Sequence, residues 1–290
     1  MALAEPAPPL HSLADPAVRD EPAIREELAR GANALSAAGC DTPRLDAELL
    51  MASAMGVDRA QLVIGARDPL PDAAAERYER MLARRLAREP VAYILGRRWF
   101  RRLELSVDRR VLIPRPESEL LVELGLTLPR SARVADVGTG SGAVALALKD
   151  ERPDLEIAGV DCSEDALAVA SANGERLGLA VAWVRADLLD DREYDAVLAN
   201  LPYVEDDAAL PPEIARYEPA GALFAGSDGL DAIRRLVALL ADRGAARLVA
   251  LEIGAGQADA AAALLAAAGF TATSRLRDLA GHERVIVGCR

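Results

Sequence analysis

The sequence has few aromatic residues, few histidines and few cysteines, and each shortage excludes something. Only two Trp, five Tyr and three Phe stand among 290 residues, so the core must be built mostly from Ala, Val and Leu. Two histidines leave little material for a histidine metal site or a Ser-His-Asp hydrolase, and no metal site is expected. Cys40, Cys162 and Cys289 lie far apart without a CxxC pair, which disfavours a disulfide scaffold and favours the cytoplasm.

Long apolar runs and an excess of positive charge are also absent. No uninterrupted apolar stretch reaches the length of about 18 residues that a membrane helix needs, so no membrane span is expected. The formal net charge of -12 disfavours a surface devoted to nucleic acid, because phosphate binding needs a basic face.

One stretch departs from the acidic balance of the chain. Between Arg77 and Arg115, twelve arginines stand against four acidic residues. This stretch fits a solvated helix face whose arginine stems cover apolar surface. It fits equally well a docking patch for an acidic partner or RNA.

The chain divides into four segments by pattern. Residues 1–20 are rich in Pro and Ala and are predicted to form a mobile tail. Residues 21–96 repeat apolar side chains at three- and four-residue steps, which predicts a small helical bundle that serves as a docking domain. Residues 97–113 alternate apolar and polar side chains, which predicts a hairpin linker to the last segment, residues 114–290.

The last segment alternates strands and helices. The predicted strands are residues 133–137, 156–160, 181–184, 194–199, 247–253, 270–276 and 284–289. No helix separates the last two strands, so they should pair as an antiparallel hairpin. The pattern predicts an α/β domain with a mostly parallel, seven-stranded sheet, helices on both faces and a ligand at the C-terminal strand ends.

A glycine-rich turn follows the first of these strands and consists of Gly138, Thr139, Gly140, Ser141 and Gly142. Its glycines let the backbone approach a ligand closely, and the next helix begins with free N–H donors. Asp161, at the end of the second strand, is placed to accept both hydroxyls of a ribose. The glycine spacing alone would also fit a dinucleotide. Asp136 favours S-adenosylmethionine instead, because its carboxylate would repel a pyrophosphate and attract a sulfonium.

The tetrapeptide Asn200, Leu201, Pro202, Tyr203 follows the fourth strand, at the tip nearest the expected methyl donor. A planar amide or aromatic amine is a poor nucleophile, since complete loss of amide resonance costs about 18–20 kcal/mol. Acceptors at the Asn200 side-chain oxygen and the Leu201 carbonyl would favour a pyramidal nitrogen and aim its lone pair. Tyr203 offers a flat wall for a planar group. These four residues are therefore the predicted catalytic and substrate-binding residues.

Two further residues, Arg115 and Glu117, flank prolines near the expected site and are assigned to substrate binding. They either order a lid over the cofactor or form a salt-bridged turn.

Six stretches carry a family resemblance: residues 111–119, 136–143, 199–203, 217–230, 251–254 and 277–284. Through them the chain from about residue 22 resembles the HemK/PrmC family of release factor N5-glutamine methyltransferases. The first and last stretches are the more specific ones. The family usually has Asn-Pro-Pro-Tyr, and Leu201 here keeps the backbone carbonyl while losing the fixed φ of proline.

The resemblance implies a Rossmann-like methyltransferase sheet, with the small N-terminal helical bundle joined by the β-hairpin. The glycine turn and Asp161 would hold S-adenosylmethionine, Asp187 and Leu188 would contact its adenine, and Phe100 would lie near the methyl donor. Residues 200–203 would hold the glutamine of the Gly-Gly-Gln motif in a class 1 release factor. The helical bundle would grip the release factor.

The expected function is methyl transfer from S-adenosylmethionine to the side-chain amide nitrogen, N5, of that glutamine. The enzyme is expected to be a cytoplasmic monomer with no membrane and no stable nucleic-acid partner. Two alternatives stay open: an adenine-N6 nucleic-acid methyltransferase, and a catalytically silent module that binds S-adenosylmethionine. A dehydrogenase is disfavoured because no proton-transferring His or Lys stands near the expected site.

Overall fold

The computed structural model describes residues 22–243 and 246–290, which belong to two compact units. The first unit ends at Leu86 and the second runs from Ala87 to Arg290. The predicted mobile tail, residues 1–20, lies outside the described residues. The division of the chain at residues 96 and 113 remains a prediction.

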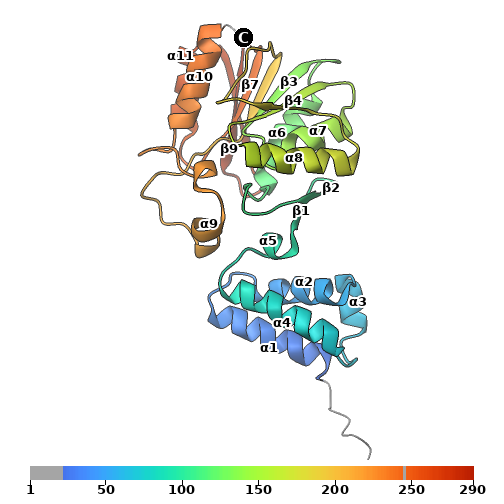
Figure 1. The fold of residues 1–290 in the computed structure, drawn as a ribbon. Coiled ribbons are helices and arrows are strands. Elements are labelled where there is room, and N and C mark those ends of the chain that lie inside the picture. Colours follow the sequence, from blue (N-terminus) through green and yellow to red (C-terminus); the bar gives the residue numbers. More distant parts are fainter. Residues whose placement is uncertain (1–21, 244–245) are drawn as a thin grey trace, which may run out of the picture. The chain divides into compact units, whose positions relative to one another are not determined.

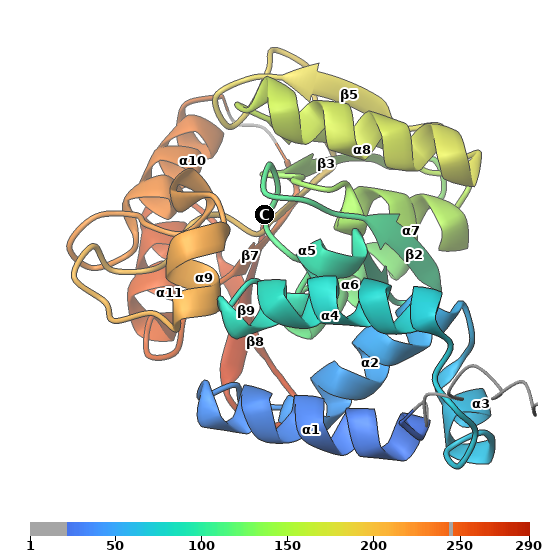
Figure 2. The same cartoon turned by 60° about the horizontal axis from the view of Figure 1, so that its bottom comes forward.

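The first unit contains four helices: α1 (Ile24–Ala37), α2 (Pro43–Met55), α3 (Arg59–Ile64) and α4 (Asp72–Leu86). Helices α1, α2 and α4 pack against one another, as Figures 1 and 2 show. The apolar repeat noted in the sequence provides the contacts, since Leu35, Leu50 and Leu82 are all buried. A buried ion pair between Arg85 and Asp46, with an N–O distance of 2.7 Å, joins α4 to α2 inside this bundle.

Helix α5 (Val91–Leu95) belongs to the second unit, although the pattern of apolar residues placed it with the bundle. Its Tyr93 donates a hydrogen bond to the Val111 carbonyl at 2.6 Å and packs against Val107 and Ile113. Strands β1 (Arg97–Phe100) and β2 (Leu103–Ser106) then pair antiparallel, which confirms the predicted hairpin.

The second unit is built on a seven-stranded sheet, as predicted. Its order across the sheet is β5 (Ala182–Arg185), β4 (Glu156–Asp161), β3 (Arg133–Val137), β6 (Ala196–Ala199), β7 (Leu248–Glu252), β9 (Glu283–Cys289) and β8 (Ala272–Arg277). The first five strands in this order run parallel. Strand β9 is antiparallel to both β7 and β8, which confirms the terminal hairpin.

Helices cover both faces of the sheet. They are α6 (Glu119–Leu126), α7 (Ala143–Glu151), α8 (Glu164–Leu177), α10 (Asp231–Arg243) and α11 (Ala258–Ala267). The short 3-10 turn η1 (Pro116–Ser118) precedes α6, while helix α9 (Pro212–Tyr217) and the 3-10 turn η2 (Ala220–Ala222) belong to the connection between β6 and α10. Alternate residues of β6 show the two faces, because Leu198 packs with α6 and α7 while Val197 packs with α10 and α11. Figure 1 shows α10 and α11 on one side and α6 and α7 on the other.

The strand order reverses direction at β3, which lies between β4 and β6. The chain leaves β3 toward β4 and β5 and later returns to β6 on the other side. A crevice opens at such a reversal, at the C-terminal ends of the strands, and it is the usual ligand position in α/β sheets. Over the described part of the chain, no helix combines the length and apolarity that crossing a membrane requires.

Candidate active site

A cavity of about 380 Å³ opens where β3, β4 and β6 end, and its volume falls within the range of small-molecule sites. Twelve of the predicted site residues line it: Arg115, Asp136, Gly138, Thr139, Gly140, Ser141, Asp161, Asp187, Leu188, Asn200, Leu201 and Pro202. These residues come from distant stretches of the sequence, and the fold brings them together around one cavity.

Four predicted site residues do not line this cavity: Phe100, Glu117, Gly142 and Tyr203. Phe100 is only 2% exposed and packs in a core cluster with residues of α6 and α7, and its place near the methyl donor stays a prediction. Gly142 has φ +81°, and a Cβ there would lie 2.9 Å from the Trp183 ring. Its glycine therefore serves the start of α7 and its packing.

The other glycines of the turn shape the cavity wall. Gly138 has φ +73°, and a Cβ on it would lie 3.1 Å from the Asn200 carbonyl oxygen. This close approach joins the β3 turn to the tip of β6. At Gly140, with φ +55°, a Cβ would meet no atom closer than 3.9 Å, so open space faces this residue. The turn thus leaves room for a ligand against its backbone.

Asp136 holds the glycine turn to the first turn of α7. Its carboxylate is 2% exposed and accepts hydrogen bonds from the Thr139 hydroxyl at 2.6 Å and the Ala145 amide at 3.1 Å. Burial raises the pKa of Asp136 to about 6. Above that pH the carboxylate places a negative charge at the cavity wall.

Asp161, at the end of β4, contacts the glycine turn at Gly140. Its carboxylate accepts from the amides of Gly140 at 3.0 Å and Ser163 at 2.9 Å. A carboxylate has about four lone-pair sites, so two remain for further donors. Asp161 is therefore fixed in place and keeps the capacity to accept the two hydroxyls of a ribose.

Leu188, which also lines the cavity, has a strained backbone. Leu188 has φ +75° and is 8% exposed, and a branched residue rarely adopts a left-handed backbone. Such strain concentrates at ligand sites. The neighbouring Asp187 forms an ion pair with Arg235, which also lines the cavity.

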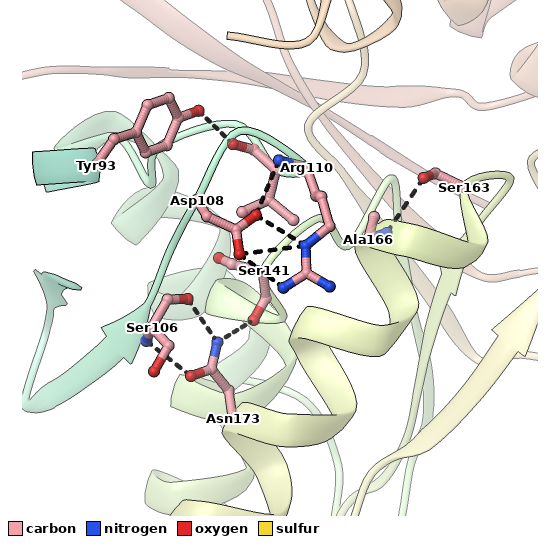
Figure 3. Close-up of polar contacts among 9 residues, drawn as sticks. Tyr93, Ser106, Asp108, Arg110, Ser141, Ser163, Ala166 and Asn173 are labelled. Carbon is pink, nitrogen blue, oxygen red and sulfur yellow. Dashed lines mark hydrogen bonds and ion pairs between the residues drawn. The ribbon is translucent and has the colours of Figure 1, made fainter. Parts of the chain in front are cut away.

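Asn173 of α8 ties the hairpin to the glycine turn. Its side chain is completely buried. It accepts from the Ser106 amide at 2.8 Å and donates to the carbonyls of Ser106 and Ser141, each at 3.0 Å. Figure 3 shows these bonds beside the Asp108–Arg110 ion pair and the Tyr93 contact. The sequence analysis missed Asn173, whose only signal was a polar residue on the apolar side of a helix.

The segment after the hairpin is anchored by Glu218, whose side chain is 1% exposed. Glu218 accepts from the Ile113 amide at 3.1 Å and pairs with Arg115 at 2.5 Å. Arg115 is thereby held at the cavity wall by a residue 103 positions further along the chain, and the assignment of Arg115 and Glu117 to substrate binding stays a prediction.

Asn200 lies at the end of a buried hydrogen-bond chain. Its Nδ2 donates to the Ser118 hydroxyl at 2.9 Å, and that hydroxyl donates to Glu252 Oε2 at 2.6 Å. Glu252 is 1% exposed, burial raises its pKa to about 7, and its Oε1 has no hydrogen-bond partner among the described residues. The sequence analysis missed Ser118 and Glu252. The available signal was an acidic residue ending the apolar strand Leu248–Glu252.

Gln257 fixes the loop that follows Asn200. Its Nε2 donates to the carbonyls of Tyr203 and Asp228, both at 3.0 Å, while its Oε1 accepts from the Gly254 amide at 2.8 Å. A Cβ on Gly229 would lie 2.2 Å from the Tyr203 carbonyl oxygen, so only glycine permits this approach. Burial raises the pKa of the Tyr203 phenol to about 12.

Most arginines of the stretch 77–115 have partners within their own unit. The pairs are Arg85–Asp46, Arg88–Glu213, Arg97–Glu104, Arg101–Glu151, Arg102–Asp150, Arg110–Asp108 and Arg115–Glu218. These pairs neutralise much of the positive charge, which favours a structural role for the stretch over a docking patch.

Comparison with known proteins finds matches for both parts of the chain. The model of the PrmC N-terminal domain matches residues 26–96, and that of the methyltransferase small domain matches residues 116–216. The release factor glutamine methyltransferase of Cereibacter sphaeroides is 44% identical over 87% of this chain and 93% of its own length. That of Pseudomonas aeruginosa is 45% identical over 86% and 94%, respectively.

A solved structure shares the fold. The hMettl16 catalytic domain, in complex with the MAT2A 3′UTR hairpin 6, superposes with a TM-score of 0.52 at 16% identity. The match covers 64% of this chain and 74% of that one. At this identity the likeness concerns the fold alone.

Proposed function

The chain belongs to the release factor glutamine methyltransferase family, an S-adenosylmethionine-dependent family, and we propose that it methylates class 1 release factors. The acceptor is the side-chain amide nitrogen, N5, of the glutamine in their Gly-Gly-Gln motif. The observation that carries the proposal is the single cavity in which the glycine turn, Asp161 and Asn200 meet.

The donor end of the cavity fits S-adenosylmethionine, which supplies a methyl group bound to a positively charged sulfur. Gly138 and Gly140 would let the backbone approach it, and Asp161 would accept the ribose hydroxyls. Asp187 and Leu188 would contact the adenine, while the Asp136 carboxylate would attract the cationic part. No phosphate-binding group is required at this turn.

The acceptor end holds the glutamine amide. Asn200 Oδ1 and the Leu201 carbonyl accept its two N–H bonds and turn its lone pair toward the methyl carbon. The nitrogen–carbon bond forms as the carbon–sulfur bond breaks, and that electron pair stays on sulfur. The nitrogen becomes positively charged and loses one proton through its acceptors to water. No strong base is needed before attack, because alkylation makes the nitrogen acidic.

The same two acceptors exclude a glutamate. A carboxylate has no N–H to offer them, and a buried acceptor without a donor costs about 1–3 kcal/mol. Leu201 supplies its carbonyl although it replaces the usual proline. Its side chain is 5% exposed and packs in the core between sheet and α10, so packing fixes the loop where the proline ring is missing.

The remaining assignments concern the whole protein. We assign residues 21–96 to docking of the release factor and residues 97–113 to the linker. The enzyme acts as a cytoplasmic monomer without a stable nucleic-acid partner.

Labelled S-adenosylmethionine tests the proposed function with three acceptors. They are a purified class 1 release factor, the same factor with Gly-Gly-Gln changed to Gly-Gly-Ala, and duplex DNA. We expect label on the unchanged factor alone. Label on DNA would transfer the assignment to an adenine-N6 methyltransferase, and bound cofactor without any labelled acceptor would indicate a silent module.

A further inference from the structure

The orientation of the Asn200 amide is set by a chain of buried hydrogen-bonding groups that runs from Asn200 through Ser118 to Glu252. Asn200 follows β6, Ser118 ends the η1 turn, and Glu252 ends β7. Ser118 is 4% exposed and Glu252 is 1% exposed, so bulk water does not compete for their hydrogen bonds. The two donor–acceptor distances, 2.9 and 2.6 Å, are those of well-formed bonds.

The chemistry of the three groups gives this chain one direction. An ionised carboxylate only accepts hydrogen bonds, so Glu252 must receive the single proton of the Ser118 hydroxyl. The hydroxyl oxygen can then only accept from Asn200. The Asn200 NH2 group is thereby directed to Ser118, and its Oδ1 is left for the cavity.

This direction matters because the two ends of an asparagine amide have opposite chemistry. With Oδ1 toward the cavity, Asn200 accepts an N–H bond from an incoming amide. With NH2 toward the cavity it would donate, and would instead favour a carboxylate or the carbonyl end of the amide.

We propose that Ser118 and Glu252 are positioning residues that hold the Asn200 amide with Oδ1 toward the substrate, and so set selectivity for an amide nitrogen. The inference rests on the proposed function, since it deepens the role of Asn200. Neither residue touches the reacting atoms, and both act through Asn200.

Protonation of Glu252 would reverse the chain. A protonated carboxyl can donate to Ser118, whose hydroxyl is then free to donate to the Asn200 oxygen and turn its amide over. The charged and titratable groups that act on Glu252 are Glu117, Arg115, Arg284 and Tyr203. Arg284 is itself paired with Asp278 at 2.9 Å, and Arg115 with Glu218, so each of these arginines already holds another carboxylate.

The unpartnered Oε1 of Glu252 argues against a purely structural role. A buried carboxylate with one unsatisfied oxygen destabilises a fold relative to a neutral isostere. Residues that break a local rule in this way are expected at functional sites.

The test compares Ser118→Ala, Glu252→Gln and the double variant with wild type. The variant pair Ser171→Ala and Glu175→Gln is the matched control, because a Ser–Glu hydrogen bond of 3.3 Å also joins these residues on the exposed side of α8. The assay measures kcat, KM for the release factor, Kd for S-adenosylmethionine, and the pH profile of kcat.

Each single variant should lower kcat about 10- to 100-fold, the usual effect of losing an outer positioning contact. The cofactor Kd should stay within about twofold. The double variant should be no worse than Ser118→Ala, because the two residues act in series. The wild-type kcat should fall toward acid pH as Glu252 protonates, and this limb should be absent from Glu252→Gln. The α8 control should match wild type throughout.

Three results would overturn the inference while leaving the proposed function intact: single variants with wild-type kcat, multiplicative losses in the double variant, or an unchanged acid limb in Glu252→Gln. A wild-type protein that labels no release factor would instead overturn the proposed function and the inference with it.

Discussion

At the scale of single residues, the two ends of the cavity have separate tasks. Asp161 lies beside the glycine turn at the end proposed to take the methyl donor. Asn200 lies at the tip of β6 and presents its amide at the acceptor end. Substitutions at these positions should therefore change different kinetic constants.

Removing the Asn200 amide should affect turnover and little else. We expect Asn200→Ala to lower kcat about 100-fold or more, because an acceptor for the reacting nitrogen is lost. Kd for S-adenosylmethionine, measured by calorimetry, should be nearly unchanged. A large loss of cofactor affinity would contradict the substrate role of Asn200.

The opposite result is expected for Asp161→Ala. Loss of charged acceptors for the ribose should weaken cofactor binding about 10- to 100-fold, since each such bond is worth about 1.5–3 kcal/mol. With saturating cofactor, kcat should recover most of its wild-type value. Tight binding by this variant would exclude Asp161 from the ribose site.

Asp136 should make cofactor affinity depend on pH. Burial raises its pKa to about 6, so the carboxylate is charged above that pH and neutral below it. We expect Kd for S-adenosylmethionine to rise as pH falls through about 6. Asp136→Asn should bind more weakly at pH 8 and lose this pH dependence. A pH-dependent Kd that persists in the variant would assign the effect to another group.

Glu252 should cost stability at neutral and alkaline pH. Its pKa is raised to about 7, so its contribution to folding is greatest when the carboxyl is protonated and is lost as pH rises through about 7. At pH 8, Glu252→Gln should be more stable than wild type by on the order of 2 kcal/mol, and at pH 5 the two should be similar. Urea unfolding at both pH values measures this, and a less stable variant at pH 8 would contradict it.

At the scale of elements, the strands were the easiest part to predict. Their apolar runs are bounded by Gly, Pro and Asp, and all seven lie within two residues of the predicted ends. The sequence also located the glycine turn and residues 200–203, because each directly follows a strand. The packing of Tyr93 in helix α5 against residues that come after the hairpin is not visible in any local pattern of the sequence.

Contacts between distant elements account for the rest of the site. Ser118 donates a hydrogen bond to Glu252, which lies 134 positions later in the sequence. Neither residue belongs to a motif that would have indicated this contact. Phe100 was assigned to the site from the family resemblance alone, and its ring packs in a core cluster.

The bond network of Asn173 should hold the hairpin to the glycine turn. Asn173→Ala removes four hydrogen bonds made by a completely buried side chain and should destabilise the protein by about 2–3 kcal/mol. Urea unfolding is the measurement, and the exposed α8 change Glu175→Ala is the control. Equal stability of the two variants would exclude this role of Asn173.

At the scale of the whole molecule, arginines of the basic stretch 77–115 form ion pairs with acidic residues of their own unit. Arg80 and Arg102 are 68% and 70% exposed, yet each faces an acid of its own unit. Such exposed pairs add little stability, about 0–1 kcal/mol, but they cancel the field that would steer an acidic partner. The formal net charge of the whole chain is -12.

Charge reversal at Arg80 and Arg102 should therefore leave KM for the release factor within about twofold, with an unchanged salt dependence. The measurement is methyl transfer at several salt concentrations. A raised KM with a flattened salt dependence would establish the stretch as a docking patch after all.

Methylation of the Gly-Gly-Gln glutamine can be tested by mass spectrometry of a release factor after incubation with the enzyme and S-adenosylmethionine. Fragmentation of the Gly-Gly-Gln peptide should locate one added methyl group on the side-chain nitrogen of the glutamine. It should disappear when Asn200→Ala replaces the wild-type enzyme. A methyl group on any other residue, or an unmodified peptide beside an enzyme that binds the cofactor, would contradict the account.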